Sequence, residues 1–210
     1  MSDTNPTVFV VDDDPPVLKA IGRVLRSTGL NVVTFESSRE FLNDYDAGVT
    51  GCLLLDLSMP DLNGLELQQA LADRGGTTPI IFLSGHGDVP SSVRAMKRGA
   101  CDFLTKPADE RELIEAVQTA IEKDRAARSE RRELAGIQSR LDSLTPRERE
   151  VLEHVVSGQL NKQIAADLGT VEKTIKVHRA RVMEKMGVES LAELVQLAQR
   201  AGIVAPAAVH

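Results

Sequence analysis

The first 120 residues alternate short apolar runs with longer amphipathic stretches. Five of the runs have the composition of β-strands, and the intervals between them are long enough for helices. The predicted strands are Thr7–Val11, Asn31–Phe35, Cys52–Leu55, Pro79–Leu83 and Cys101–Thr105. The first, third and fourth are almost wholly apolar, which is typical of parallel strands covered by helices on both faces. The pattern therefore predicts a doubly wound α/β domain with a five-stranded parallel sheet.

The last 68 residues carry only helical patterns and predict an all-α domain of four helices. The segment Thr145–Glu148 has the composition of a capping box with proline at the first helical position. Asn161 is expected to cap a second helix that ends at Gly169, and a third is predicted over Glu172–Met186. A second capping box, Ser190–Glu193, is expected to open the fourth helix. The two middle helices and their glycine-containing turn are typical of a helix-turn-helix.

A highly charged segment lies between these two patterns. Glu122–Glu133 holds nine charged side chains in twelve residues and no large apolar one. We interpret it as a solvated, salt-bridged helix that continues the last helix of the first domain, with a disordered linker as the alternative. The sequence therefore predicts three parts, a domain at 1–121, a helical linker at 122–142 and a helical domain at 143–210.

Charge and composition narrow the class of protein. The net charge of −6 divides into −8 for residues 1–121 and +1 for each of the other two parts, which suggests two different tasks. No apolar run approaches 18 residues, and the first residues lack the pattern of a secretory signal. Cys52 and Cys101 each lie in a strand-like run and are expected to be free thiols. Together these features predict a cytoplasmic protein with no membrane contact.

Polar residues gather at the carboxyl ends of the predicted strands, the edge at which open parallel sheets bind ligands. They are Asp12–Asp14 after the first strand, Asp56 after the third, Ser84 after the fourth and Lys106–Pro107 after the fifth. Two carboxylates 4–5 Å apart repel each other by roughly 3–4 kcal/mol at an effective dielectric constant near 20, so such a cluster predicts a bound cation. Oxygen ligands suit Mg²⁺. A metal, an acceptor carboxylate, a hydroxyl and a lysine are the groups that phosphoryl transfer uses.

Residues 6–122 resemble the receiver domain of two-component response regulators. The segments that carry the resemblance are Val10–Asp14, Leu53–Gly64, Phe82–Asp88 and Phe103–Pro107. The resemblance implies a flavodoxin-like sheet with strand order 2-1-3-4-5. It also implies that Asp56 accepts a phosphoryl group from a sensor histidine kinase.

The same resemblance assigns roles to the neighbours of Asp56. The residues assigned to Mg²⁺ are Asp12, Asp13, Asp56 and Ser58, the last through its carbonyl. Those assigned to the phosphoryl group and the switch are Ser84, Phe103 and Lys106. Pro107 is expected to follow a cis peptide bond, and Ala108 departs from the family, which often has an aromatic residue there. His86 is better explained as a loop histidine than as a metal ligand.

The third helix of the second domain has two distinct faces. At 100° per residue, Ile175, Val182 and Met186 fall together with His178 on a face that must turn toward the core. The opposite face is polar and mostly basic, and carries Lys173, Lys176, Val177, Ala180 and Glu184. Such a face suits the major groove of DNA, where lysines reach phosphates or guanine edges and valine contacts a thymine methyl. An ordinary solvated helix surface is the alternative.

Three segments of this domain resemble the LuxR-type helix-turn-helix, namely Leu144–Leu152, Asn161–Gly169 and Lys173–Val188. With the receiver, the whole chain resembles a NarL/FixJ-type response regulator, and Ser84–Asp88 with Val93–Ala100 favours the FixJ branch. The implied DNA contacts are Lys176 and Val177 to bases, and Lys162, Lys173, Thr174 and Arg179 to phosphates. Two positions depart from the pattern, since some relatives have a base-contacting lysine at Ala180 and most have a capping Ser or Thr at Val171.

These observations predict a phosphorylation-gated transcription regulator rather than an enzyme. Phosphorylation of Asp56 is expected to favour a homodimer through the fourth helix and fifth strand, whose two output domains bind double-stranded DNA at adjacent half-sites. RNA polymerase is a further expected partner. Two alternatives stay open at this point. One is a Mg²⁺-dependent phosphotransferase or phosphatase, although Ser58 stands where aspartyl phosphatases typically have a second acid; the other is a DNA-binding regulator that needs no phosphorylation.

Overall fold

Five parallel strands form one sheet, in the order β2-β1-β3-β4-β5. The structure is a computed structural model that describes residues 5–85 and 89–203, so His86 lies outside the described residues. The strands are β1 (Thr7–Val11), β2 (Asn31–Phe35), β3 (Gly51–Asp56), β4 (Ile80–Ser84) and β5 (Asp102–Thr105). The predicted fold and strand order are confirmed. The first two strands have the predicted bounds. β3 is one residue longer at each end, β4 is shifted by one residue toward its carboxyl end and β5 begins one residue later, so that Asp56 and Ser84 end their strands.

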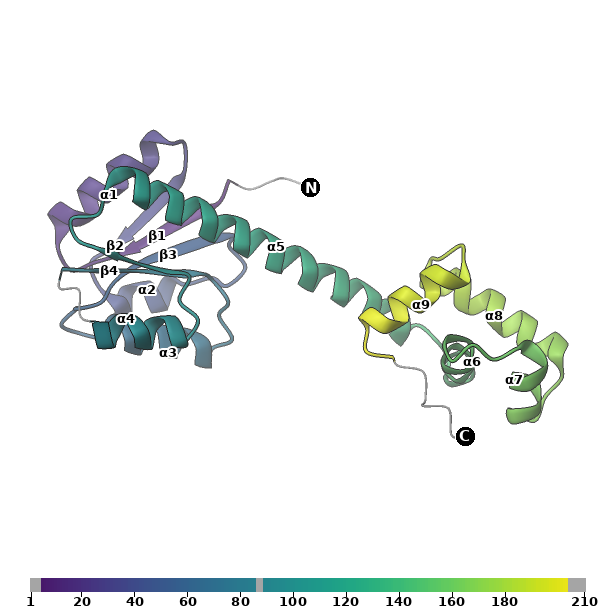
Figure 1. Cartoon of the computed structure of the whole chain (residues 1–210). Coiled ribbons are helices and arrows are strands. Elements are labelled where there is room, and N and C mark those ends of the chain that lie inside the picture. Colours follow the sequence, from purple (N-terminus) through teal and green to yellow (C-terminus); the bar gives the residue numbers. More distant parts are fainter. Residues whose placement is uncertain (1–4, 86–88, 204–210) are drawn as a thin grey trace. The chain divides into compact units, whose positions relative to one another are not determined.

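Helices cover both faces of the sheet (Figure 1). The helices are α1 (Pro15–Ser27), α2 (Ser38–Asp44), α3 (Gly64–Asp73), α4 (Val89–Lys97) and α5 (Glu110–Asp142). One apolar core joins the sheet to α1 and α5 through side chains such as Leu25 and Val117. The other joins it to α2, α3 and α4 through Phe41, Leu67 and Ala95. Burial on both faces explains why the strands have nearly continuous apolar sequences.

The chain divides by packing into two units, one ending at Arg128 and the other beginning at Ser129. The division falls within α5, a single helix of 33 residues. Its first half packs on the sheet, and Ile137 and Leu141 belong to the core of the second unit. Residues 122–142 are therefore helical, as predicted, and not disordered. The prediction that 122–133 is solvated needs correction at Asp124 and Arg128, because Asp124 is buried and Arg128 is mostly covered.

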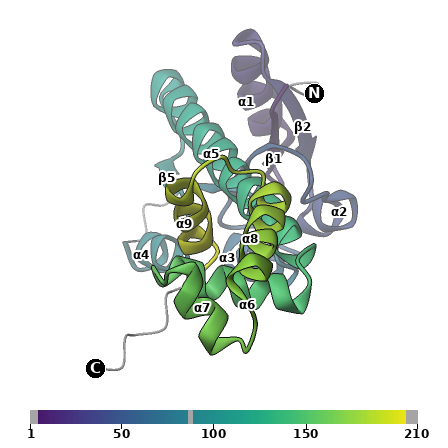
Figure 2. The same cartoon turned by 90° about the vertical axis from the view of Figure 1, so that its right-hand side faces the viewer.

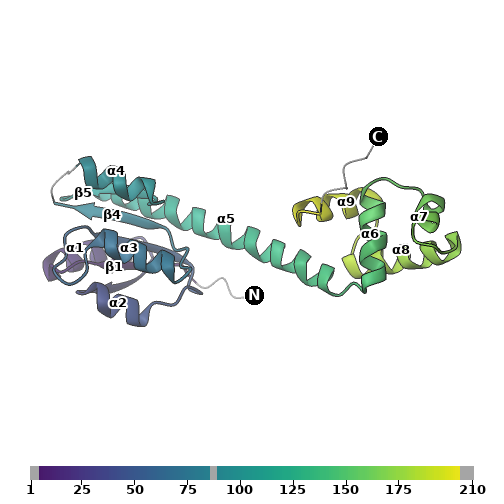
Figure 3. The same cartoon turned by 90° about the horizontal axis from the view of Figure 1, so that it is seen from below.

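The second unit consists of the end of α5 with α6 (Pro146–Val156), α7 (Asn161–Asp167), α8 (Glu172–Met186) and α9 (Leu191–Arg200), which Figures 2 and 3 show from two sides. A core of aliphatic side chains from all five helices holds the unit together. The helix α7, the turn around Gly169 and α8 form the predicted helix-turn-helix. No helix among the described residues is long and apolar enough to cross a membrane.

The helix starts of this unit agree only partly with prediction. Thr145 and Glu148 form the expected capping box. Asn161, however, is the first residue of α7 and not its cap, because its side chain accepts a hydrogen bond from Arg179 instead. Ser190 caps α9 through the Glu193 amide as predicted, and the Glu193 carboxylate accepts from the Ser190 hydroxyl and from the Glu189 amide.

Candidate functional site

Two aspartates lie side by side at the carboxyl ends of neighbouring strands. Asp56 ends β3 and Asp12 follows β1, and the register that pairs Val11 with Leu55 places them next to each other. Both are buried, with exposed fractions of 0% for Asp12 and 4% for Asp56. The sequence prediction that these carboxylates meet at one edge of the sheet is thus confirmed.

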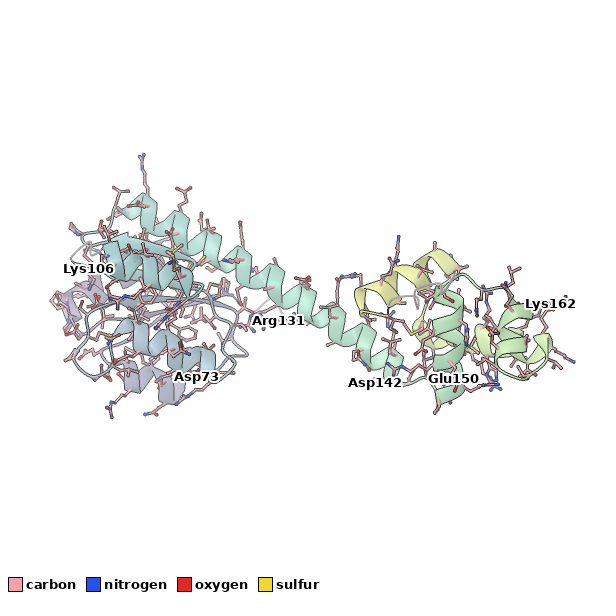
Figure 4. All side chains as sticks on the ribbon, turned by 60° about the horizontal axis from the view of Figure 1, so that its bottom comes forward. Asp73, Lys106, Arg131, Asp142, Glu150 and Lys162 are labelled. Atoms are coloured by element: carbon pink, nitrogen blue, oxygen red, sulfur yellow. The ribbon has the colours of Figure 1, made fainter. Side chains whose placement is uncertain are left out.

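Lys106 lies between the two carboxylates. Its Nζ atom is 2.5 Å from Asp12 Oδ2 and 2.5 Å from Asp56 Oδ1. The backbone N–H of Lys106 donates to the Ser84 carbonyl at 2.7 Å, and the peptide bond to Pro107 is cis, as the resemblance implied. Figure 4 shows Lys106 at the α/β unit. The lysine thus supplies one positive charge to two buried negative ones.

Burial and ion pairing act in opposite directions on these groups. Burial raises the pKa of Asp12, and the hydrogen bond from Lys106 only partly offsets this rise. Burial by itself would lower the pKa of Lys106, but its hydrogen bonds to Asp12 and Asp56 outweigh that effect and raise the pKa. With both aspartates ionised, the three groups carry a net charge of −1, and the site therefore attracts a further cation.

The other predicted site residues surround this group. The Ser58 amide donates to Asp56 Oδ2 at 2.7 Å. Ser84 is buried at the end of β4, and the ring of Phe103 is half-buried with its centroid 6.4 Å from that of Phe82. Asp13 is exposed beside Asp12.

Apart from Lys106, the polar side chains around Asp56 offer oxygen atoms, which suit a hard divalent cation. The buried carboxylates of Asp12 and Asp56 share only one cationic group, that of Lys106. Within 5–85 and 89–203, no three acidic, histidine or cysteine side chains are arranged to hold a metal.

A glycine that sequence reasoning missed fixes the position of Asp56. A Cβ atom on Gly64 would lie 2.5 Å from the Asp56 carbonyl oxygen and 2.9 Å from the Phe82 ring. Gly64 is the first residue of α3, which Asn63 and Glu66 open with a reciprocal capping box. The Asn63–Glu66 spacing was the available signal for this helix start. The absence of a side chain lets α3 begin directly against the end of β3.

The helix-turn-helix presents its predicted outer face to solvent. Ile175, Val182 and Met186 are buried as expected. His178 is half-buried, and its Nδ1 atom has no hydrogen-bond partner among the described residues. The side chains predicted to reach DNA are exposed at Lys162, Lys173, Lys176 and Val177, and half-buried at Thr174 and Arg179. Figure 4 shows Lys162 on α7.

Two of these side chains are held by neighbours. Arg179 donates from Nη1 to Asn161 Oδ1 at 2.9 Å, which connects α8 to the start of α7. Lys176 Nζ lies 3.2 Å from Glu172 Oε1 one turn earlier. No side-chain cap is present at Val171, in agreement with its departure from the LuxR-type pattern.

Comparison with known proteins covers both units. The sequence matches the response regulator receiver domain family over residues 8–118 and the luxR family of bacterial regulatory proteins over residues 142–198. It is 46% identical over 202 residues to nodulation protein W of Bradyrhizobium diazoefficiens, covering 96% of this chain and 89% of that one. It is also 46% identical over 205 residues to the transcriptional regulatory protein FixJ of Azorhizobium caulinodans, covering 95% and 94%.

Solved structures of response regulators are similar to this chain as well. The response regulator StyR matches with a TM-score of 0.88 and 43% identity, covering 94% of this chain and 100% of that one. Full-length FixJ from B. japonicum matches with a TM-score of 0.59 and 39% identity, covering 96% and 99%.

Proposed function

Because this chain belongs to the NarL/FixJ family of two-component response regulators, we propose that phosphorylation of Asp56 by a sensor histidine kinase switches its control of transcription. The chain has a receiver domain and a LuxR-type DNA-binding domain. In this proposal the receiver comprises 1–121, a helical linker 122–142, and the output domain 143–210. The protein acts as a regulator and not as an enzyme, and it works in the cytoplasm, where the kinase and the DNA meet it.

The arrangement at the sheet edge supports Asp56 as the acceptor. Its Oδ2 atom is held by the Ser58 amide, and Oδ1 faces the Lys106 ammonium. In the proposed step a carboxylate oxygen of Asp56 attacks phosphorus, so that an O–P bond forms while the N–P bond of the kinase phosphohistidine breaks. The histidine nitrogen leaves with the bonding electron pair. Lys106 then stabilises the negative charge on the transferred oxygens.

Asp12, Asp13, Asp56 and the Ser58 carbonyl would hold Mg²⁺ in this proposal. When bound, the ion supplies positive charge that offsets the charge on the phosphoryl oxygens. The donor chemistry supports this assignment, since the buried carboxylates carry more negative charge than Lys106 balances. Asp13 is exposed beside this pair and is therefore accessible to an incoming ion.

The switch would begin when Lys106 and Ser84 turn toward the new charge. A phosphoryl group brings about two negative charges and three strong acceptor oxygens. Moving a two-state equilibrium from 1:99 to 99:1 takes about 5.5 kcal/mol. A few charge-assisted hydrogen bonds at about 1.5–3 kcal/mol each supply that amount. Phe103, half-buried against Phe82, would reorient together with Ser84.

The output would be a homodimer that binds double-stranded DNA. Three apolar side chains, Val89, Val93 and Met96, are exposed at successive turns of α4, which supports α4 and β5 as the dimer face. The side chains proposed to contact DNA are Lys162, Lys173, Thr174, Lys176, Val177 and Arg179. Two output domains on one dimer raise each other's effective concentration at adjacent half-sites. RNA polymerase is the further partner that transcriptional control requires.

The observation that carries this proposal is the 2.5 Å contact of Lys106 with both Asp12 and Asp56 at the sheet edge. Its test is incubation of the full chain with acetyl phosphate and Mg²⁺, followed by intact mass measurement. We expect one acid-stable phosphoryl adduct in the wild type and none in Asp56→Asn. An adduct that persists in Asp56→Asn would contradict Asp56 as the acceptor, and sustained turnover of a small phosphoester would favour a phosphatase instead.

A further inference from the structure

A hydrogen bond between two side chains joins the helices of the helix-turn-helix. Arg179 on α8 donates from Nη1 to Oδ1 of Asn161, the first residue of α7, at 2.9 Å. Both residues are half-buried. Because a guanidinium only donates, the amide must present its oxygen to Arg179. Among the described residues Arg179 has no other hydrogen-bond acceptor, so the rest of its guanidinium fork can bind an acceptor from outside the chain.

The positive charge of Arg179 is not balanced within its own helix. Side chains three and four positions apart are neighbours on a helix surface. None of the α8 residues at those distances from Arg179 is acidic, since they are Ile175, Lys176, Val182 and Met183. Lys176 differs in this respect, because Glu172 stands one turn earlier with its Oε1 atom 3.2 Å from the lysine Nζ.

The neighbouring helix α7 holds Arg179 without balancing its charge either. The one acidic residue of α7 is Asp167, at the far end of that helix from Asn161, and it accepts a hydrogen bond from Gln159 Nε2 at 3.1 Å. Lys162, which follows Asn161, is exposed and adds a second positive charge to the start of α7. Arg179 is thus held in place by a neutral amide and keeps its full positive charge.

Stability alone would favour aspartate at position 161. A carboxylate in the first turn of a helix interacts favourably with the helix dipole. Its hydrogen bond with a guanidinium is also stronger than that of a neutral amide. Asparagine lacks both advantages, but it orients Arg179 without cancelling the charge. A guanidinium that is oriented and still charged has the geometry and the charge that a phosphate group recognises.

We propose that Asn161 is a positioning residue, which holds the Arg179 guanidinium toward a phosphate of the DNA backbone and leaves its charge available to that phosphate. The proposal rests on the proposed binding of α8 to DNA. In a helix-turn-helix the second helix lies in the major groove and the first crosses the backbone. Arg179 belongs to the second helix and bonds the first, which suits a phosphate contact at the edge of the groove.

The test compares two properties of the full chain, the exchange protection of the α7 and α8 amides and the salt dependence of DNA binding. The probe is a DNA duplex of mixed sequence, because phosphate contacts carry no sequence information. Loss of one phosphate contact per chain reduces the slope of log affinity against log salt concentration by about 0.9, which is about fivefold in affinity near 0.15 M salt.

We expect Asn161→Asp to increase the exchange protection of both helices and yet to weaken DNA binding about fivefold, with the slope reduced by about 0.9. Both results have one cause, since the new carboxylate would pair with Arg179. A contact that served the fold alone would improve in this variant without any change of the slope. The salt dependence therefore separates positioning for phosphate from a purely structural role.

Two controls separate this pairing from simple repulsion between the new carboxylate and DNA. Gln163→Glu adds one negative charge at an exposed position of the same helix, where the side chain oxygen accepts from the Leu160 amide, and it should leave the slope unchanged. In an Arg179→Gln background, Asn161→Asp should weaken binding by less than about twofold, because the cation that it would cancel is already absent.

An Asn161→Asp variant with the slope of the wild type would overturn the proposal. So would an equal loss of affinity from Asn161→Asp with and without Arg179, or an Arg179→Gln variant that binds the duplex as tightly as the wild type. In each of these cases the proposed binding of the chain to DNA would stand. A wild type that does not bind the duplex at low salt would instead contradict the DNA binding itself.

Discussion

Lys106 balances part of the charge of two buried carboxylates, Asp12 and Asp56, which form the acidic edge of the sheet. The stability of this edge therefore depends on a cation. We predict that Lys106→Met lowers the stability of the receiver by about 1–3 kcal/mol without Mg²⁺, because the Asp12 and Asp56 charges lose their partner. Mg²⁺ should restore more stability to the variant than it adds to the wild type, since lysine and metal compete for the same oxygens. Chemical denaturation with and without Mg²⁺ measures both effects.

The control for this variant is Lys97→Met, which removes an exposed lysine on α4 away from the acidic edge. We expect it to change stability by less than about 0.5 kcal/mol. If Mg²⁺ stabilises Lys106→Met no more than it stabilises Lys97→Met, the metal does not share the oxygens that Lys106 contacts.

Gly64 offers a second test at single-residue level. Gly64→Ala should destabilise the receiver by about 1–3 kcal/mol and slow phosphorylation, because its Cβ would lie 2.5 Å from the Asp56 carbonyl oxygen. Gly136→Ala in α5 is the matched control, since a Cβ there meets nothing within 4 Å. That substitution should stabilise the helix by about 0.5–1 kcal/mol. Equal effects of the two substitutions on thermal unfolding would show that α3 can move away from β3 at little cost.

Among the helices, α5 depends on an unusual contact with the loop before β3. Arg128 donates from its guanidinium to the carbonyls of Ala47, Gly48 and Val49, and its Nε atom bonds Asp124. Asp124 in turn accepts from the amide of Gly51, a residue whose Cβ would lie 1.8 Å from the Thr7 carbonyl oxygen. This contact secures the helix to the receiver through Arg128, seven residues beyond the boundary that the sequence suggested.

We predict that Arg128→Ala destabilises the receiver by about 2–4 kcal/mol, because it leaves Asp124 as a buried charge without its cation. Hydrogen exchange at the Gly51 amide should accelerate in the same variant. Arg125→Ala is the matched control, since Arg125 is an exposed arginine of the same helix. If both variants unfold at the same denaturant concentration, the contact contributes nothing to stability.

An ion pair joins α6 to α8 in the DNA-binding unit and predicts a pH dependence. Lys185 Nζ lies 2.6 Å from Glu148 Oε2, and this hydrogen bond, with that from the Thr145 amide, lowers the pKa of Glu148 from its ordinary 4.5 to about 2. A lowered carboxyl pKa stabilises the folded state above pH 4.5, and that contribution is lost as the pH falls toward 2.

We therefore expect Glu148→Gln to cost about 1–2 kcal/mol at neutral pH, after allowance for solvent screening at Lys185, whose side chain is 33% exposed. The difference from wild type should shrink as the pH falls through the range between 4.5 and 2. Exchange protection of the α6 and α8 amides, followed in the full chain, measures it. A difference that stays constant from pH 6 to pH 3 would contradict the role of this ion pair.

Strong local signals made most of the elements predictable. Continuous apolar runs located the strands, and the spacing of Thr145 and Glu148 located α6. The acidic edge was predictable because the carboxyl ends of parallel strands meet at one edge, as Asp12 and Asp56 do. Contacts between residues far apart in the sequence could not be predicted in this way. The charges of Asp124 and Arg128 suggested a solvated helix, yet both side chains pack against the loop before β3.

Asn161 shows the same limit in the second unit. Asparagine is a common N-cap residue, but in the folded chain the Asn161 side chain accepts a hydrogen bond from Arg179 on another helix. Local propensity cannot identify such a partner, because the two residues lie 18 positions apart. The bridging position of Lys106 was also invisible, since sequence places it at the same edge as the aspartates but not between them.

Two features of the whole molecule fit a switch whose input and output lie in separate domains. They are the different charges of the two domains and the single helix that runs from one into the other. The acidic receiver and the weakly basic output domain share one helix, α5, and residues 129–135 of that helix are exposed. Figure 4 shows Arg131 and Asp142 along this helix. With nine basic and eight acidic residues after position 142, a single output domain has too little net positive charge for tight binding to DNA. In the proposed function, pairing of two chains supplies the affinity that one output domain lacks.

The most direct test of this account is sedimentation velocity of the full chain with Mg²⁺, before and after addition of beryllofluoride. Beryllofluoride mimics the phosphoryl group on an aspartate, and the comparison uses the wild type and Asp56→Asn. We predict a shift from monomer to dimer in the wild type and no shift in Asp56→Asn. A wild type that stays monomeric, or an Asp56→Asn variant that dimerises equally, would contradict a dimer gated by phosphorylation of Asp56.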